Sequence, residues 1–144
     1  MNDLSTTRQD LGLLAMRLMA GTVFVFHGAQ KLFGWFGGYG LDGTAGFMEQ
    51  LGLPLPFLSA LLAGLAEFVG GLALISGLGV RLSAAPLAFT MLVGAFVAHD
   101  GFSIQSGGME YALTLAVFAA GLGLTGPGSL VLRVPSRAAA AARA

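Results

Sequence analysis

Cysteine is absent from this 144-residue sequence, and charged residues are scarce. Without cysteine, the chain cannot form a disulfide, bind a metal through thiolates or carry out dithiol chemistry by itself. Charged side chains make up 10% of the residues, whereas a typical soluble domain has about 25%. So few charges cannot cover the surface of a soluble protein. The net charge of zero gives no sign of nucleic-acid binding.

Apolar residues make up 56% of the sequence, and the mean hydropathy is +0.82. They form four runs of about the 20 residues that a membrane-crossing helix needs. We therefore expect spans at about 11–33, 57–78, 82–99 and 109–125, in a single all-α domain over 1–144. The expected fold is an integral membrane four-helix bundle, antiparallel and up-down, within a lipid bilayer. Small residues at three- and four-residue spacing in the second run predict a face that packs closely on another helix.

The connection between the first two spans is unusually rich in glycine and aromatic residues. Trp35, Phe36 and Tyr39 suit the headgroup level of a membrane, where an aromatic ring lies half in water. We expect an outer loop here, with a short interfacial helix over 44–51 that begins at Thr44 as the N-cap.

The distribution of lysine and arginine predicts the orientation. With four spans, one end carries Arg8, Arg81, Arg133, Arg137 and Arg143. The other end carries Asp42, Glu49 and Asp100, with Lys31 as its nearest cation. The positive-inside rule then places both termini in the cytoplasm. We expect the tail, residues 129–144, to be poorly ordered.

Six ionisable side chains lie within or at the ends of the predicted spans: Arg17, His27, Lys31, Glu67, His99 and Glu110. On a helix, Arg17 and Lys31 lie about 40° apart, and His27 lies on the same flank. An unpaired charge in hydrocarbon costs at least about 2.5–3.5 kcal/mol. We therefore expect these groups to face a sheltered interior, with Glu67 paired to Arg17 or Lys31, as candidate ligand-binding or proton-relay residues.

Each candidate also has a purely structural interpretation. An ion pair between Arg17 and Glu67 would fix helix register. Lys31 can extend to the headgroups from a helix end, and an acid such as Glu110 is favourable at a helix N-terminus. The only two histidines, on different helices at similar depth, are too weak a signal to predict haem or a metal site.

Four segments together resemble the DoxX family of small membrane proteins: FVFHGAQKLFGWFGG (24–38), GLDGTAGFMEQLGLPLP (40–56), AEFVGGLALISGLGVRL (66–82) and MEYALTLAVFAAGLGLTGPGSL (109–130). The resemblance extends in order and spacing from Arg17 to Leu130. The family pattern falls on His27, Gly28, Lys31, Glu67, Gly70, Gly71, Arg81, Glu110, Gly126, Pro127 and Gly128.

The resemblance implies a multi-pass four-helix protein of the bacterial cytoplasmic membrane. Members of the family are usually described as oxidoreductase subunits, most without an established reaction. Some relatives act with thiosulfate:quinone oxidoreductase, and some associate with superoxide dismutase and a sulfurtransferase. Because this chain has no cysteine, a partner would have to supply any thiol chemistry.

Two functions remain open at this point, and whether the chain is itself an enzyme is left open with them. The first is a redox-linked subunit that binds a quinone in the bundle interior, with Lys31 or His27 donating to its carbonyls and Glu67 and Glu110 relaying protons. The second is a non-catalytic scaffold that recruits an oxidoreductase or an oxidative-stress partner. A carrier for a small lipophilic solute is a third possibility, and the apolar perimeter is compatible with a homo-oligomer.

Overall fold

The structure is a computed structural model that describes residues 2–132. Residues 133–144, most of the tail expected to be poorly ordered, lie outside the described residues, together with the three arginines of that tail. The described part is all-helical. Its α-helices are α1 (Asn2–Phe33), α2 (Gly40–Gln50), α3 (Pro56–Ser76), α4 (Val80–Val97) and α5 (Glu110–Thr125), and its short 3-10 helices are η1 (Trp35–Gly37) and η2 (Ile104–Ser106).

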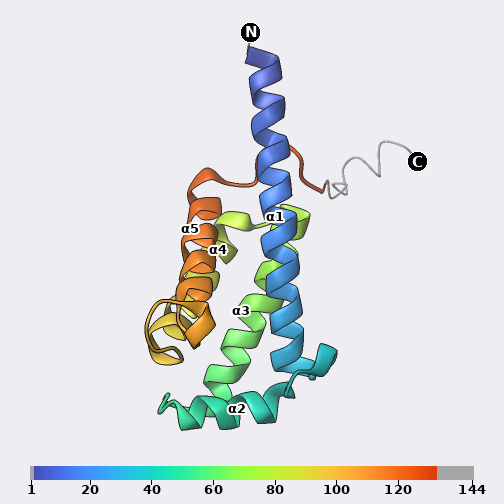
Figure 1. Cartoon of the computed structure of the whole chain (residues 1–144). Coiled ribbons are helices and arrows are strands. Elements are labelled where there is room, and N and C mark those ends of the chain that lie inside the picture. Colours follow the sequence, from blue (N-terminus) through green and yellow to red (C-terminus); the bar gives the residue numbers. More distant parts are fainter. Residues whose placement is uncertain (1, 133–144) are drawn as a thin grey trace, which may run out of the picture.

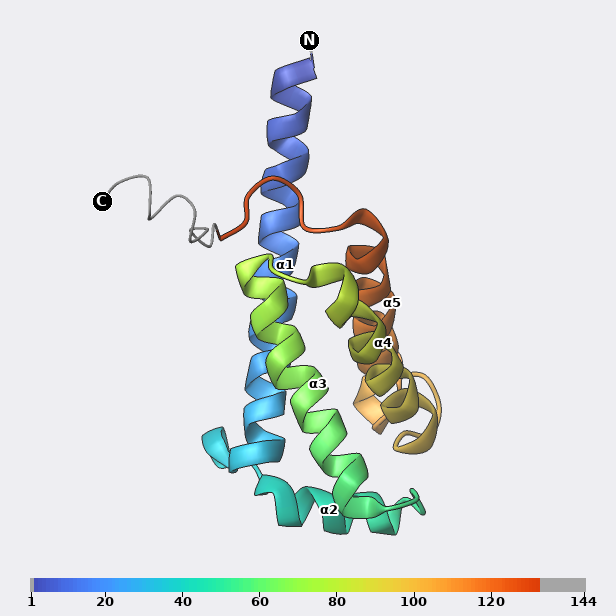
Figure 2. The same ribbon diagram turned by 180° about the vertical axis from the view of Figure 1, so that it is seen from behind.

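The helices α1, α3, α4 and α5 run side by side in alternating directions, while α2 lies across one end of them (Figures 1 and 2). They overlap the four segments that the sequence predicts to be helical. By length and composition, α1, α3 and α4 are suited to cross a membrane, over Thr6–Phe33, Pro56–Ser76 and Val80–Val97. The apolar helix α5 is shorter, with 16 residues.

The connection between α1 and α3 is more helical than the sequence predicts. It contains η1 and the 11-residue helix α2, which starts four residues before the expected N-cap. The prediction for Thr44 is wrong, because its hydroxyl bonds to the carbonyl of Gly40 at 2.7 Å from inside the helix. Because α2 already begins at Gly40, Thr44 lies inside the helix and cannot be its N-cap.

Glycines bring the backbones of α1 and α3 into close approach. A Cβ added at Gly28 of α1 would lie 2.4 Å from the backbone nitrogen of Phe68, and one added at Gly71 of α3 would lie 2.7 Å from the carbonyl oxygen of Gly21. Small residues allow this kind of contact between membrane helices, where dispersion forces replace the hydrophobic effect. The predicted close-packing face of the second run is therefore confirmed.

The remaining helices are organised around this pair. Helix α4 packs mainly on α5 and also on α3, where Leu87 fills the space above Gly70. A hydrophobic core joins the α1/α3 pair to the α4/α5 pair. It consists of Ala20, Phe24, Leu74, Val80, Leu87, Ala119 and Leu122. Helices α1 and α5 make few contacts with each other. The bundle is therefore closed on the α1/α3 side and loosely packed between α1 and α5.

The close contact of α1 and α3 generates a stability prediction. We expect Gly28→Ala to lower the unfolding free energy in detergent by about 1–3 kcal/mol, the usual range for overpacking. The matched control is Gly12→Ala on the same helix, where an added Cβ meets nothing within 4 Å. The control should be neutral or slightly stabilising, because alanine favours helix. Equal effects of the two substitutions in thermal unfolding would contradict the close approach.

Candidate functional site

A buried ion pair joins α1 to α3. Lys31 Nζ lies 2.6 Å from Glu67 Oε2, which confirms one of the two pairings expected for this carboxylate. The Glu67 side chain is 1% exposed and that of Lys31 is 26% exposed. The second carboxylate oxygen, Glu67 Oε1, is buried and has no hydrogen-bond partner within the described residues. Lys31 does not simply extend to the headgroups, because its ammonium group turns inward to the carboxylate.

Lys31 also lines a cavity of about 610 Å³ between the end of α1 and helix α2. We call it the α2 vestibule. Its polar lining comes from both helices and from the segment between them: Gln30, Lys31, Tyr39, Thr44 and Gln50. Lys31 therefore lines the vestibule, and its ammonium group bonds to the buried Glu67 carboxylate.

Arg17 makes a different set of contacts from the predicted ion pair. It is fully buried, and its guanidinium donates to the carbonyl of Pro127 and, at 2.6 Å, to that of Leu130. These carbonyls belong to the segment that follows α5 and crosses to α1. Arg17 therefore holds this segment against α1, as a structural residue. The alternative pairing of Arg17 with Glu67 is not formed.

A second contact, which no sequence pattern predicted, holds the same segment. The backbone N–H of Ser129 donates to Asp10 Oδ1 at 2.9 Å, and the Ser129 hydroxyl bonds to Asp10 Oδ2. Gly128, next to Ser129, has a φ of +73°, a conformation that favours glycine and directs the chain toward Asp10. The sequence feature that marks this turn is the pair of glycines on either side of Pro127, and in the structure both have positive φ.

The two histidines lie in different environments. The His27 ring is half-buried and faces the ring of Tyr111 on α5, with centroids 6.4 Å apart. His99 follows α4, and its Nδ1 lies 2.8 Å from the carbonyl oxygen of Gly94, which can only accept a hydrogen bond. No group of three or more potential metal ligands occurs within residues 2–132.

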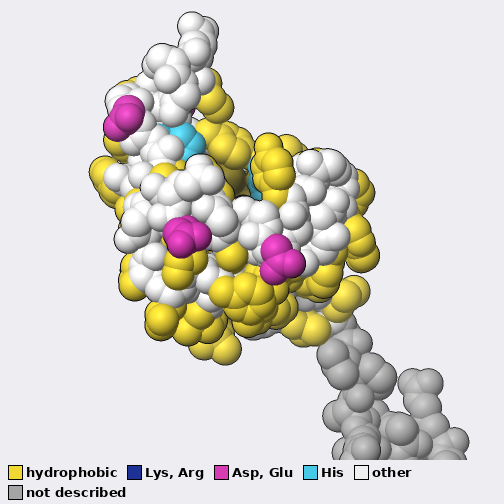
Figure 3. Space-filling view, turned by 90° about the horizontal axis from the view of Figure 1, so that it is seen from below, with side chains coloured by type: hydrophobic (Ala, Val, Ile, Leu, Met, Phe, Trp, Pro, Cys, Tyr) yellow, Lys and Arg dark blue, Asp and Glu magenta, His cyan; other side chains and the backbone are white. Residues whose placement is uncertain are grey.

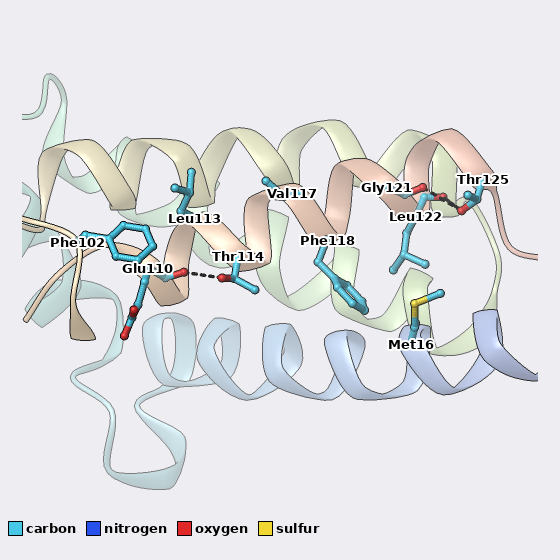
Figure 4. A pocket seen from close by; sticks show the side chains of 10 residues that line it. All are labelled: Met16, Phe102, Glu110, Leu113, Thr114, Val117, Phe118, Gly121, Leu122 and Thr125. Atoms are coloured by element: carbon cyan, nitrogen blue, oxygen red, sulfur yellow. Dashed lines mark hydrogen bonds between the residues drawn. The ribbon is translucent and has the colours of Figure 1, made fainter. Parts of the chain in front are cut away.

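Glu110 lies at one end of an apolar cavity of about 570 Å³ between α1 and α5. We call this cavity the α1/α5 groove. Figure 4 shows Phe118 and Leu122 of α5 pointing toward Met16 of α1, with Phe102 beside Glu110 at the other end. The carboxylate of Glu110 accepts a hydrogen bond of 2.8 Å from the backbone N–H of Ile104. The acid therefore stabilises the η2 turn and also borders the groove.

The six candidate residues thus fall into separate groups. Lys31 and Glu67 form one group. Glu110 lines the α1/α5 groove, and His27 contacts Tyr111, the residue that follows Glu110 in α5. Arg17 and His99 bind backbone carbonyls elsewhere. Sequence reasoning identified the groove's acid but missed the residues that shape the groove around it: Met16, Phe102, Thr114, Val117, Phe118 and Gly121.

Three long apolar helices, a charged pair sheltered between two of them and an extensive apolar exterior define a multi-pass membrane protein. The sequence model of the DoxX family matches residues 12–100, well over half of the chain. The chain therefore belongs to the DoxX family.

Curated relatives agree with this assignment over most of their length. The chain is 30% identical over 123 residues to a Bacillus subtilis protein named "Putative oxidoreductase CatD", covering 85% of each. It is also 30% identical over 123 residues to the Escherichia coli "Inner membrane protein YqjF", covering 84% of this chain and 88% of the relative. It is 27% identical over 127 residues to the "Inner membrane protein YphA" of the same species, covering 83% and 86%. No solved structure matches the chain significantly. The names of the two Escherichia coli relatives and the three long apolar helices agree that the chain is a multi-pass protein of the inner membrane.

The contacts of Arg17 predict a purely structural effect of its removal. Arg17→Met leaves two carbonyls of the segment after α5 without their donor, and an unsatisfied buried group costs about 1–3 kcal/mol. We expect a lower melting temperature in detergent and faster proteolysis after α5. The control is Arg8→Met, because Arg8 is exposed on the same helix. An unchanged cleavage rate in Arg17→Met would show that the Arg17 hydrogen bonds are not needed to hold the segment after α5 against α1.

Proposed function

We propose that this DoxX-family chain is a redox-linked membrane subunit that binds a quinone, or a similar small lipophilic molecule, in the α1/α5 groove. The observation that carries the proposal is the groove itself. It is large enough for a ring and part of a tail, at about 570 Å³, and it is lined almost entirely by apolar side chains. A relative at 30% identity carries an oxidoreductase name, which supports a redox context.

The two ends of the groove differ in chemistry. Glu110 lies at one end, with the His27–Tyr111 contact close by, so protonatable groups gather there. Apolar residues and glycine continue along α5 toward Leu122. A quinone has this same polarity, because its carbonyls need hydrogen-bond partners while its tail needs hydrocarbon. The aromatic rings of Phe102 and Phe118 offer stacking surfaces for the head group.

This assignment revises the residues expected to contact a quinone. Lys31 and Glu67 bond to each other and do not line the groove. We therefore assign the hydrogen bonds to the ligand to the protonatable groups at the other site, Glu110 with His27 and Tyr111 near it. The groove is bordered by α5, and one side of α5 carries exposed apolar residues such as Val117 and Leu124. A molecule dissolved in the bilayer would therefore reach the groove sideways.

Groove occupation is tested by filling the groove. Val117→Trp places a large ring at a groove-lining position that is 67% exposed. We expect it to weaken binding of a short-chain quinone to the purified protein by about tenfold or more, measured by photocrosslinking with an azidoquinone. The control, Leu124→Trp, adds the same ring at an 85% exposed position of α5 outside the groove and should bind normally.

Two results would contradict the proposal. Equal labelling of both variants, or no more quinone on the wild type than on protein-free vesicles, would remove groove binding. Co-purification of a protein partner in that case would favour the scaffold function, with its oxidoreductase or oxidative-stress partner.

We further propose that α5 is a fourth membrane crossing and that both termini are cytoplasmic. Arg8 lies near the start of α1 and Arg81 at the start of α4, and both helices begin at the end away from α2 (Figure 1), which supports this orientation by the positive-inside rule. On the α2 end, Figure 3 shows acidic and histidine side chains and no lysine or arginine among the visible described residues. Sixteen helical residues span about 24 Å, against about 30 Å of hydrocarbon, and such a mismatch costs only fractions of a kcal/mol per Å.

The absence of cysteine makes this topology directly measurable. We expect Tyr39→Cys and Gln105→Cys to react with an impermeant maleimide in intact spheroplasts. We expect Leu78→Cys and Leu132→Cys to react only after the membrane is permeabilised. Gln105 and Leu132 lie on opposite sides of α5 in the sequence, so labelling of both from the same side would exclude α5 as a crossing.

A further inference from the structure

The carboxylate of Glu67 has an unusual position for a merely structural ion. One oxygen bonds to Lys31 Nζ, and the other, Oε1, is buried without a hydrogen-bond partner within residues 2–132. A buried polar atom in this state costs free energy that a protonated carboxyl or a water molecule would recover. The position therefore suits a group that gains and loses a proton.

Lys31 connects Glu67 to water. Lys31 contacts the α2 vestibule, where Gln30, Tyr39 and Gln50 supply polar groups, and its ammonium reaches the carboxylate at 2.6 Å. The vestibule volume of about 610 Å³ leaves room for many water molecules. Vestibule, ammonium and carboxylate thus form a continuous polar series.

The opposite direction is closed by hydrocarbon. Beyond Glu67, the interior between α1, α3 and α4 is filled by Phe24, Leu74 and Leu87, which are 1%, 0% and 0% exposed. Farther toward the start of α1 lies the buried Arg17, whose guanidinium is held by carbonyls of the segment after α5. Within the described residues, this apolar core offers a proton no side chain that could carry it.

The charged groups around Glu67 are few. Helix α1 presents Lys31 and, one turn earlier, the half-buried His27, which interacts electrostatically with Lys31 and contacts Tyr111 of α5. The acids of α2, Asp42 and Glu49, are exposed. Helix α4 carries one charged residue, Arg81, which lies beside Gly126 at the far end of the bundle. Within the described residues, Lys31 is the single ion-pair partner of Glu67. Proton exchange at Glu67 is thus coupled to one cation.

We propose that Glu67 is a proton-exchange site open to water on the α2 side only, with Lys31 as the gate and the α2 vestibule as the port. The site binds a proton from water on Glu67 and returns it by the same route. It is separate from the α1/α5 groove. Its physiological use, to take up or release protons beside a redox-linked ligand, rests on the proposed function, but the one-sided access does not.

The test follows the protonation of Glu67 itself, without any quinone. The full chain is placed in sealed proteoliposomes of known orientation, and the carboxyl C=O stretch is recorded by infrared spectroscopy. Glu67→Gln identifies the band by its loss. We expect the band to follow pH steps on the α2 side and to ignore steps on the other side. A response to the other side, to both sides or to neither would overturn the proposal.

A matched pair of variants tests the port without touching the ion pair. Gln50→Trp places a ring at an exposed position of the vestibule wall, and we expect it to slow the response of the band by about tenfold. Gly46→Trp is the control on the same helix, outside the lining, where an added Cβ meets nothing within 4 Å. It should respond at the wild-type rate. Equal rates in both variants would exclude the vestibule as the route.

This experiment fails independently of the proposed function. Val117→Trp fills the groove but leaves the vestibule intact, so its carboxyl band should respond normally while its quinone labelling is lost. A normal band response with no quinone binding in any variant would remove the groove proposal and keep the proton site. Quinone binding with an unresponsive band would do the reverse.

Discussion

The structure depends on the need to shelter one carboxylate in a hydrocarbon environment. Glu67 is buried in the middle of α3, and it is tolerable there because Lys31 reaches it from α1. The two helices also lie very close together, which the glycines at 28 and 71 permit. The tight α1/α3 pair in turn places α2 across the helix ends and fixes the vestibule beside Lys31.

The sequence was sufficient for features that follow from composition and spacing. Hydrophobic runs located the long helices, and the cost of a lone charge in lipid predicted a partner for Glu67. It was insufficient where the partner is backbone. Arg17 binds two carbonyls, and carbonyls are present at every position, so no residue type marks them. The Asp10–Ser129 contact joins positions far apart in the chain and depends on a turn geometry that only the fold defines.

The groove escaped sequence reasoning for a related reason. Its lining is ordinary apolar residues of α5 with Met16 of α1, and such residues look the same whether a helix face is packed or open. The cavity arises because α5 packs on α4 and hardly touches α1. Sequence patterns describe which face of a helix is apolar, but the position of a gap depends on how four helices share their contacts. The two cavities consequently differ: one is lined almost entirely by apolar side chains, while the other has a larger share of polar groups and lies beside α2.

Helix α1 is much longer than the bundle it belongs to. Its 32 residues extend for about 48 Å, so its first turns project beyond the other helices (Figure 1). The helix is unbroken from these first turns to the part of α1 that holds Lys31. A protein bound to these first turns would therefore hold the same continuous helix whose other end carries the ammonium group that bonds to Glu67.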